Sequence, residues 1–228
     1  MTAQEKTDIA EFLDLAAITM GSAYHSGKRE YNFTDDDSPE QIRSDIESCS
    51  NCALCTTRAH AVPGEGQKRP LLMIIGEVPD NDEDSSGKPF AGESGQLLDK
   101  MLLSINLSRE RDCFLTNIIK CRTPIQRDPQ ADEITACSSY IERQIRLMQP
   151  CFILCAGRIA AQTLLKTNAP IGNLRNRFID YKIDDISIPS IVTYHPNALL
   201  RNEELKRPAW EDLKLLRTAM EKNQDIVT

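Results

Sequence analysis

The sequence of 228 residues lacks the features that mark membrane and secreted proteins. It has no run of about 18 apolar residues, so we expect no membrane span. Acidic residues interrupt the apolar stretch at the N-terminus, which argues against a secretory signal and favours a cytoplasmic location. Aromatic residues make up only 5% of the chain, and no internal repeat is visible. The content of 40% hydrophobic and 27% charged residues is that of an ordinary globular protein, and the length fits one decorated domain.

The sequence also lacks a surplus of basic residues. Its 27 Lys and Arg against 34 Asp and Glu give a net charge of −7, whereas proteins that bind nucleic acids usually carry a basic excess. The charge is uneven, because residues 120–127 contain Lys120, Arg122 and Arg127 without an acid. Such a local basic face can bind phosphates on an acidic chain, so composition leaves the partner open. We expect a monomer, since no heptad pattern or long apolar edge is evident.

Eight cysteines in a chain expected in the cytoplasm should not be paired as four disulfides. Metal ligation, catalysis and plain burial are the choices. Cys49 and Cys52 form a C-x2-C pair, and Cys121 and Cys137 form a wider pair; together they could close one site for zinc or for a [4Fe–4S] cluster. Cys55 makes a second C-x2-C with Cys52 and is a rival ligand. The other three cysteines lie in apolar segments, where we expect buried thiols.

Strand-like and helix-like segments alternate from residue 70 onward. Short apolar runs predict four buried strands, at residues 70–77, 113–120, 151–157 and 186–195. Helical spacing and acidic first turns predict helices at residues 94–104 (with Ser94 as N-cap), 128–149, 158–166 and 202–222. This order predicts an α/β fold, a three-layer α/β/α sandwich with a central, mainly parallel four-stranded sheet.

The N-terminal part of the chain has a different character. Residues 3–19 have the spacing of an amphipathic helix, and residues 26–41 are polar and rich in turn formers. We therefore divide the chain into an N-terminal helix and polar arm, residues 1–43, and a compact domain, residues 44–228.

Polar residues follow three of the four predicted strands. Glu77 and Asp80 come after the first strand, Asn117 lies near the end of the second, and His195 follows the fourth. The carboxyl ends of parallel strands meet at one edge of a sheet, and ligands bind there. We therefore expect these side chains to share one site, although up to 118 residues separate them in sequence.

Residues 76–98, GEVPDNDEDSSGKPFAGESGQLL, form the most distinctive segment. They lack the Gly-Lys-Ser/Thr ending of a nucleotide P-loop, yet a glycine-rich loop before a helix suits the close approach of an anion. This segment resembles the first signature of the family 4 uracil-DNA glycosylases, the iron–sulfur, thermophile-type class. The resemblance extends to TNIIKCRTPIQRDPQADEITAC (116–137), AGRIAAQTLL (156–165) and YHPNALLRNEELKRPAWEDL (194–213). The motifs agree in order and spacing over more than two thirds of the chain.

The resemblance assigns the cysteines. The family has a Leu, an Arg and a Gly at fixed distances after its C-x2-C pair. Counting from Cys52 finds Leu54, Arg58 and Gly64, whereas counting from Cys55 finds none of them. The ligands of a structural [4Fe–4S] cluster are then expected to be Cys49, Cys52, Cys121 and Cys137.

The resemblance also implies a reaction. The protein would be a hydrolase, a monofunctional DNA glycosylase that flips uracil out of DNA and cleaves its N-glycosidic bond in base-excision repair. The departing uracil is an anion. Catalysis therefore needs a platform for the ring, a reader of its edge, a donor to the developing oxyanion and a placed water.

Three residues are expected to contact the flipped uracil. Phe90 would stack on the ring, and the Asn117 carboxamide would match N3–H and O4, where cytosine offers the reverse pattern. His195, as a neutral imidazole, would donate to O2 of the leaving anion. Each has a plainer alternative from local sequence alone: a core Phe, a turn Asn and a satisfied strand-end His.

The loop after the first strand supplies the other expected site residues. Gly76, Glu77 and Val78 should present backbone groups around the uracil. Glu83 and Glu77 are expected to join His195 as catalytic residues. Glu83 would either orient the water or exclude the 5-methyl group of thymine, and its alternative is a solvated acidic loop.

Residues 197–201, NALLR, resemble the family's intercalation loop. Leu199 or Leu200 would fill the gap left by the flipped base, with packing of the last helix as the alternative. Arg201 and Arg122 would bind phosphates.

Three residues depart from the family pattern. Val78 replaces Gly or Ala, Asp80 replaces Gly, and Asn197 replaces Ser. The change to Asp80 predicts strain if the loop needs a positive φ at that position. The departures leave two rival readings: a glycosylase for another damaged base and a non-catalytic binder of DNA damage. A third, a redox protein that uses its cluster for electron transfer, rests on the cysteines.

Overall fold

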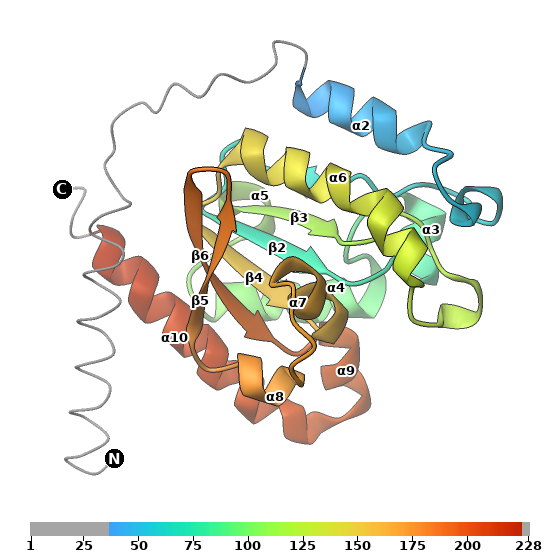
Figure 1. The fold of residues 1–228 in the computed structure, drawn as a ribbon. Coiled ribbons are helices and arrows are strands. Elements are labelled where there is room, and N and C mark those ends of the chain that lie inside the picture. Colours follow the sequence, from blue (N-terminus) through green and yellow to red (C-terminus); the bar gives the residue numbers. More distant parts are fainter. Residues whose placement is uncertain (1–36, 225–228) are drawn as a thin grey trace, which may run out of the picture. The chain divides into compact units, whose positions relative to one another are not determined.

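Six strands form the central sheet, in the order β1-β3-β2-β4-β6-β5 (Figure 1). The computed structural model describes residues 37–224. The strands are β1 Glu65–Gly66, β2 Leu72–Gly76, β3 Cys113–Asn117, β4 Phe152–Ala156, β5 Phe178–Ile183 and β6 Ile186–Thr193. The four predicted strands are confirmed as β2, β3, β4 and β6, and their pairings with one another are parallel.

The predicted number of four strands is wrong, because two antiparallel strands lie at the edges of the sheet. β1 is only two residues long and contains Gly66, so it leaves no apolar pattern in the sequence. β5 is half-exposed and carries Asp180 and Lys182, unlike a strand buried on both faces. It forms a hairpin with β6 through a turn in which Asp184 adopts φ 50°.

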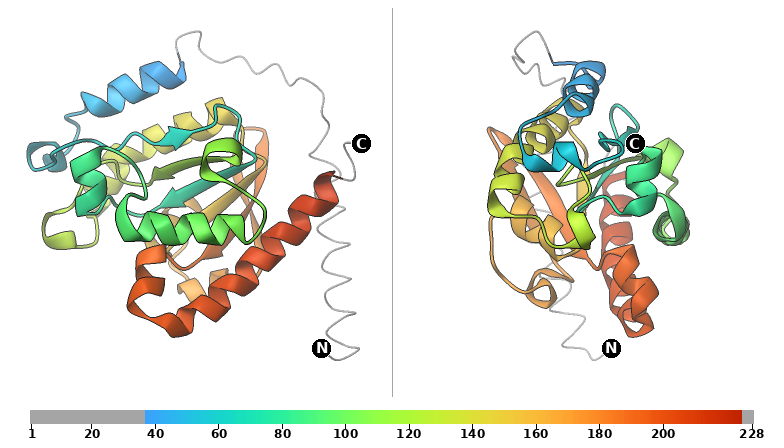
Figure 2. Two further views of the ribbon diagram at one scale, coloured as in Figure 1. Left: turned by 180° about the vertical axis from the view of Figure 1, so that it is seen from behind. Right: turned by 90° about the vertical axis from the view of Figure 1, so that its right-hand side faces the viewer.

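Helices cover both faces of the sheet (Figures 1 and 2). They are α2 Pro39–Glu47, α3 Asn81–Ser86, α4 Gly92–Leu103, α5 Arg109–Asp112, α6 Ala131–Met148, α7 Arg158–Leu164, α8 Ile171–Leu174, α9 Pro196–Arg201 and α10 Lys206–Gln224, with 3-10 turns η1 Ala53–Thr56, η2 Pro124–Gln126 and η3 Glu203–Leu205. Helices α2, α6, α7 and α8 share one core with the sheet, and α4, α9 and α10 share the other. The predicted three-layer α/β/α architecture is confirmed.

Strand β2 shows why a continuous apolar run predicts a central strand. Its side chains alternate between the two cores: Met73 and Ile75 face the α6 side, and Leu72 and Ile74 face the α10 side. All four are fully buried.

Two boundaries differ from the predictions. Helix α4 begins at Gly92 with Ala91 at the N-cap, so the prediction of Ser94 as N-cap is wrong; the Ser94 hydroxyl donates to the Ala91 carbonyl instead. Helix α2 begins at Pro39, within the predicted polar arm, and buries Ile42 and Ile46 in the core shared with α6. The helix predicted at residues 3–19 lies outside the described residues.

Within residues 37–224, no helix is both long enough and apolar enough to cross a membrane.

Candidate active site

Three residues pack together at the carboxyl ends of β2 and β3. Gly76, the last residue of β2, pairs in register with Asn117, the last residue of β3. A Cβ atom on Gly76 would lie 2.1 Å from Oδ1 of Asn117 and 2.7 Å from Cζ of Phe90. Only glycine therefore lets the amide and the ring approach the backbone here.

Glu83 fixes the orientation of the Asn117 amide. Its Oε1 accepts a hydrogen bond from Nδ2 of Asn117 at 2.9 Å. The same oxygen also accepts from the backbone N–H of Phe90, so it acts as an acceptor and the amide nitrogen must face it. The amide oxygen then points elsewhere; it is fully buried and has no hydrogen-bond partner among the described residues. A buried acceptor without a partner is rare and indicates a place for an incoming donor.

Glu83 also holds the two loops on either side of it. Its Oε1 accepts from the backbone N–H of Phe90 at 2.6 Å, and its Oε2 accepts from the backbone N–H of Asp80 at 2.8 Å. Burial raises the pKa of Glu83 to about 7, although these donors and the Asn117 amide favour the ionised form. Glu83 is 3% exposed, so the alternative of a solvated acidic loop does not hold for this residue.

Phe90 is held in an unusual conformation. Its φ is 50°, which is costly for a bulky residue. The Glu83 carboxylate holds its N–H, and the Arg109 guanidinium donates to its carbonyl at 3.1 Å. Sequence reasoning missed Arg109, because it lies at the start of the short helix α5 and outside the quoted motifs. Strain maintained by a charged group on each side of a residue is typical of a functional position.

His195 follows β6 and is the N-cap of α9. Its Nδ1 accepts from the backbone N–H of Asn197 at 3.2 Å, so the neutral ring carries its proton on Nε2. Burial lowers the pKa of His195 to about 4, which keeps the imidazole neutral at physiological pH. The ring stacks on Phe90 with 5.5 Å between centroids and 17° between planes. The structure therefore places a neutral N–H donor beside the aromatic ring.

Glu77 caps a helix. Its Oε1 accepts from the backbone N–H of Ile159 at 2.7 Å, in the first turn of α7. Burial raises the pKa of Glu77. A Cβ atom on Gly157 would lie 2.5 Å from this oxygen, so the glycine makes the contact possible. The carbonyls of Gly76 and Glu77 accept from the N–H groups of Ile118 and Ile119, at 3.0 and 3.1 Å.

Asp80 is an N-cap rather than a strained loop residue. Its φ of −86° lies in the ordinary range, so the predicted strain is wrong. Its Oδ1 accepts from the N–H groups of Asp82 and Glu83, and with Glu83 it forms a capping box at the start of α3. An acid is a better N-cap than the glycine of the family pattern.

An open cleft with a volume of about 770 Å³ adjoins these residues. Glu77, Val78, Asp80 and His195 line it, together with the α9 residues Leu200 and Arg201. Asn117 and Phe90 are almost fully buried and are not among the residues that line it.

The expected DNA-binding residues divide into two groups. Leu200 is 41% exposed and Arg201 is exposed, and both line the cleft. Leu199 is 2% exposed and packs in the core shared with α10, so it is not available as a wedge. Arg122 donates to Asn81 at 2.8 Å and to Asp84 at 3.3 Å, which fixes it against α3.

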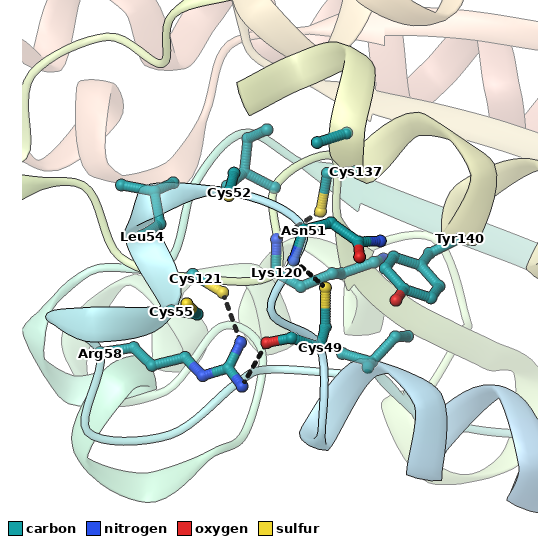
Figure 3. Close-up of a pocket in the computed structure, with 13 residues that line it drawn as sticks. Cys49, Asn51, Cys52, Leu54, Cys55, Arg58, Lys120, Cys121, Cys137 and Tyr140 are labelled. Carbon is teal, nitrogen blue, oxygen red and sulfur yellow. Dashed lines mark hydrogen bonds between the residues drawn. The ribbon is translucent and has the colours of Figure 1, made fainter. Parts of the chain in front are cut away.

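The cysteines expected to bind a cluster line a second cavity (Figure 3). In that view the sulfur atoms of Cys49, Cys52, Cys121 and Cys137 surround a common space, with Cys55 beside Cys121. Among the described residues, no three Cys, His, Asp or Glu side chains form a group that could hold a single metal ion. The cavity brings together η1, the segment that follows β3 and the first half of α6.

Three of the four sulfur atoms accept hydrogen bonds. Arg58 donates to Sγ of Cys121 at 3.1 Å, the N–H of Asn51 to Sγ of Cys49 at 3.5 Å, and the N–H of Lys120 to Sγ of Cys137 at 3.4 Å. Nitrogen donors directed at sulfur suit thiolates better than thiols.

Lys120 connects this cavity to the active site. Lys120 is 1% exposed, and its ammonium donates to Oγ1 of Thr116 at 2.6 Å, to the carbonyl of Asn117 at 2.8 Å and to Oε1 of Gln144 at 2.9 Å. Burial lowers the pKa of Lys120 to about 8. Its place in the basic run at residues 120–127 had suggested a phosphate-binding face. Because Lys120 is buried, it does not belong to such a face. The sequence does carry a sign of this position near the cavity, because Lys120 directly precedes the expected cluster ligand Cys121.

Comparisons with known proteins identify the family of the chain. A family model described as the uracil DNA glycosylase superfamily matches residues 63–214. The type-4 uracil-DNA glycosylase of Sulfurisphaera tokodaii is 40% identical over 186 residues, which cover 79% of this chain and 84% of that protein. That of Saccharolobus solfataricus is 40% identical over 189 residues, covering 81% and 87%.

A bacterial relative extends the likeness. The type-4 uracil-DNA glycosylase of Thermotoga maritima is 32% identical over 193 residues, 83% of this chain and 98% of that protein. The chain therefore belongs to the uracil-DNA glycosylase superfamily, within its type-4 family.

Proposed function

We propose that this protein is a monofunctional DNA glycosylase that removes uracil from DNA by hydrolysis, as the first step of base-excision repair. The observation that carries the proposal is the Asn117 amide, whose orientation Glu83 fixes and whose buried oxygen lacks a partner among the described residues. Membership of the type-4 family supports the same conclusion.

The fixed amide selects uracil over cytosine. Its free Oδ1 accepts from N3–H of uracil, and the second Nδ2 proton donates to O4. Cytosine has an acceptor at N3 and a donor at C4, so it would place like groups against each other. A site built to pair a specific edge rejects an analogue with the wrong groups strongly, because buried polar atoms are then left unpaired.

Phe90 and His195 act on the ring and on the leaving group. The Phe90 ring provides an apolar face for the flipped base. The Nε2–H of His195 donates to O2 as negative charge develops there, and the neutral imidazole needs no proton transfer to do so.

We assign positioning rather than catalytic roles to the two glutamates. Glu83 holds Asn117 and Phe90, and Glu77 holds the first turn of α7. Leu200 enters the duplex in place of the flipped nucleotide, and Arg201 binds a phosphate beside the cleft.

We propose that Cys49, Cys52, Cys121 and Cys137 bind a [4Fe–4S] cluster. Support comes from one cavity lined by all four cysteines and from nitrogen donors to the sulfur atoms of three of them. When bound, the cluster cross-links the segment before η1 to the β3–α6 unit that carries Lys120 and Asn117. Iron and sulfide analysis of purified protein tests this, and zinc without iron would contradict it.

The function is tested with an oligonucleotide that contains one uracil, followed by alkaline cleavage of abasic sites. We expect the wild type to cut at the uracil and Asn117→Ala to lose at least about 100-fold in rate. Asn173→Ala, an exposed residue of α8, is the control and should retain the wild-type rate. No cutting of single-stranded, U:A or U:G substrates by protein with its cluster intact would refute uracil removal and direct the search to other damaged bases.

A further inference from the structure

Three large apolar side chains are exposed among the residues that the structure describes: Leu103 at 65%, Leu200 at 41% and Ile125 at 97%. Leu200 is the expected wedge on α9. Ile125 lies in the loop between β3 and α6, and its neighbours Thr123 and Arg127 line the same cleft as Leu200.

The backbone of Ile125 is strained as well. Its φ of 55° and ψ of 22° are left-handed, a conformation that β-branched side chains rarely adopt. Its side chain has almost no packing that could compensate for this strain, because it is 97% exposed. Neither burial nor local backbone preference explains an isoleucine at this position.

The loop that carries Ile125 is nevertheless well anchored. Thr123 is buried, and its hydroxyl donates to the carbonyl of Arg127 at 2.7 Å, which closes the base of the loop. The Arg127 guanidinium makes two hydrogen bonds to the carboxylate of Glu133, at 2.8 and 2.6 Å. A closed base that holds a strained, exposed apolar side chain outward suits a residue that acts on a partner.

We propose that Ile125 is a second apolar contact with DNA, which presses against the bases beside the flipped nucleotide while Leu200 takes the place of that nucleotide. The inference rests on the proposed function. A single exposed apolar side chain beside an open cleft suits insertion between bases. It is too small for a stable protein interface, which needs about 1,000 Å² of buried surface or more.

Substitution by glycine separates this role from a structural one. Glycine adopts the left-handed conformation without strain, so Ile125→Gly should unfold at a higher temperature than the wild type. The same variant should bind duplex DNA more weakly, by roughly tenfold or more, as expected for the loss of one buried isoleucine. A merely structural residue would not become more stable and bind more weakly at once.

The binding probe is a duplex with one 2′-fluoro-deoxyuridine, which resists hydrolysis, and affinity is measured by fluorescence anisotropy at two salt concentrations. We expect the ratio of dissociation constants of Ile125→Gly and the wild type to be the same at both, because an apolar contact releases no counterions. Leu103→Ala, an exposed leucine at the end of α4, should bind as the wild type does.

Wild-type affinity in Ile125→Gly would overturn the proposal, and so would an equal loss of affinity in Leu103→Ala. The proposed function is judged separately, by whether the wild type removes uracil from the hydrolysable duplex.

Discussion

The side-chain amide of Asn197 donates a hydrogen bond to Oδ2 of Asp80 at 3.3 Å. These are two of the three positions at which the chain departs from the family pattern, and they lie on different elements, α9 and the N-cap of α3. The backbone N–H of Asn197 also donates to His195. The two departures thus form one contact that ties the start of α3, the helix that contains Glu83, to α9, whose N-cap is His195.

A double-mutant cycle tests whether this contact is a unit. Asp80→Ser keeps an N-cap for α3 but is too short to reach Asn197, and Asn197→Ala removes the donor. Each single substitution should lower the free energy of unfolding. The double variant should lose less than the sum of the two single losses, with a coupling energy of about 0.5–1.5 kcal/mol. Urea unfolding of the four proteins measures it. Additive effects would show that the contact contributes nothing.

The buried carboxyl of Glu83 predicts a pH-dependent stability. Its pKa is raised from 4.5 to about 7 by burial, so between these values the folded protein binds more protons at this group than the unfolded chain. Stability is then lost as pH rises through this window, by an amount on the order of 3 kcal/mol. Glu83→Gln removes this term. We therefore expect the free energy of unfolding of Glu83→Gln, compared with that of the wild type, to be more favourable at pH 8 than at pH 5. Urea unfolding at several pH values measures it. If the free energies of the two proteins changed with pH in parallel, the assignment would be contradicted.

His195 should show no titration in the working pH range. Burial lowers its pKa to about 4, so the ring is neutral from pH 5 upward and its protonation cannot limit the rate there. Its ring signals in NMR spectra should shift only as pH falls toward 4. His195→Asn should reduce the single-turnover rate by roughly 10²–10³-fold, the usual effect of losing one oxyanion donor. A ring that titrates near pH 6.5 would contradict this assignment, because its protonation would then change within the working pH range.

Long, fully buried elements were predictable from the sequence, and short ones were not. Strands β2, β3, β4 and β6 are recognisable in the sequence as apolar runs, because helices cover both of their faces. Helix α9 spans only six residues, so its rotation, which buries Leu199 and exposes Leu200, is decided by packing against α4 and α10. The sequence pattern could therefore identify Leu199 and Leu200 as candidates for the wedge, but it could not show which of the two is exposed.

The same limit applies to the charged residues of the site. Glu83 was recognisable as an acid of the motif, but its contacts follow from α3 folding back so that residue 83 reaches Asn117. Lys120 looked like a surface cation because composition ignores three-dimensional neighbours. Asn117 and His195 could be placed at one edge of the sheet, since parallel topology alone determines that.

The buried ammonium of Lys120 should support uracil recognition from below. It donates to the carbonyl of Asn117, so Lys120→Met leaves that carbonyl and Gln144 without their donor. We expect the single-turnover rate to fall about tenfold or more, because small displacements of a positioning group are costly. Lys182→Met, an exposed residue of β5, should leave the rate unchanged. A wild-type rate in Lys120→Met, with iron content intact, would limit Lys120 to a structural role.

Cys52 and Cys55 form a matched pair that decides the ligand set. Both line the cluster cavity and lie in or next to η1, so substituting either makes a similar local change. Cys52→Ser should lose iron and the visible absorbance of the cluster, and should unfold at a lower temperature, because the cross-link to Cys121 and Cys137 is weakened. Cys55→Ser should keep its iron and its melting temperature. The reverse result would move the ligand from Cys52 to Cys55, and iron retained in both variants would mean that either cysteine can serve as the fourth ligand.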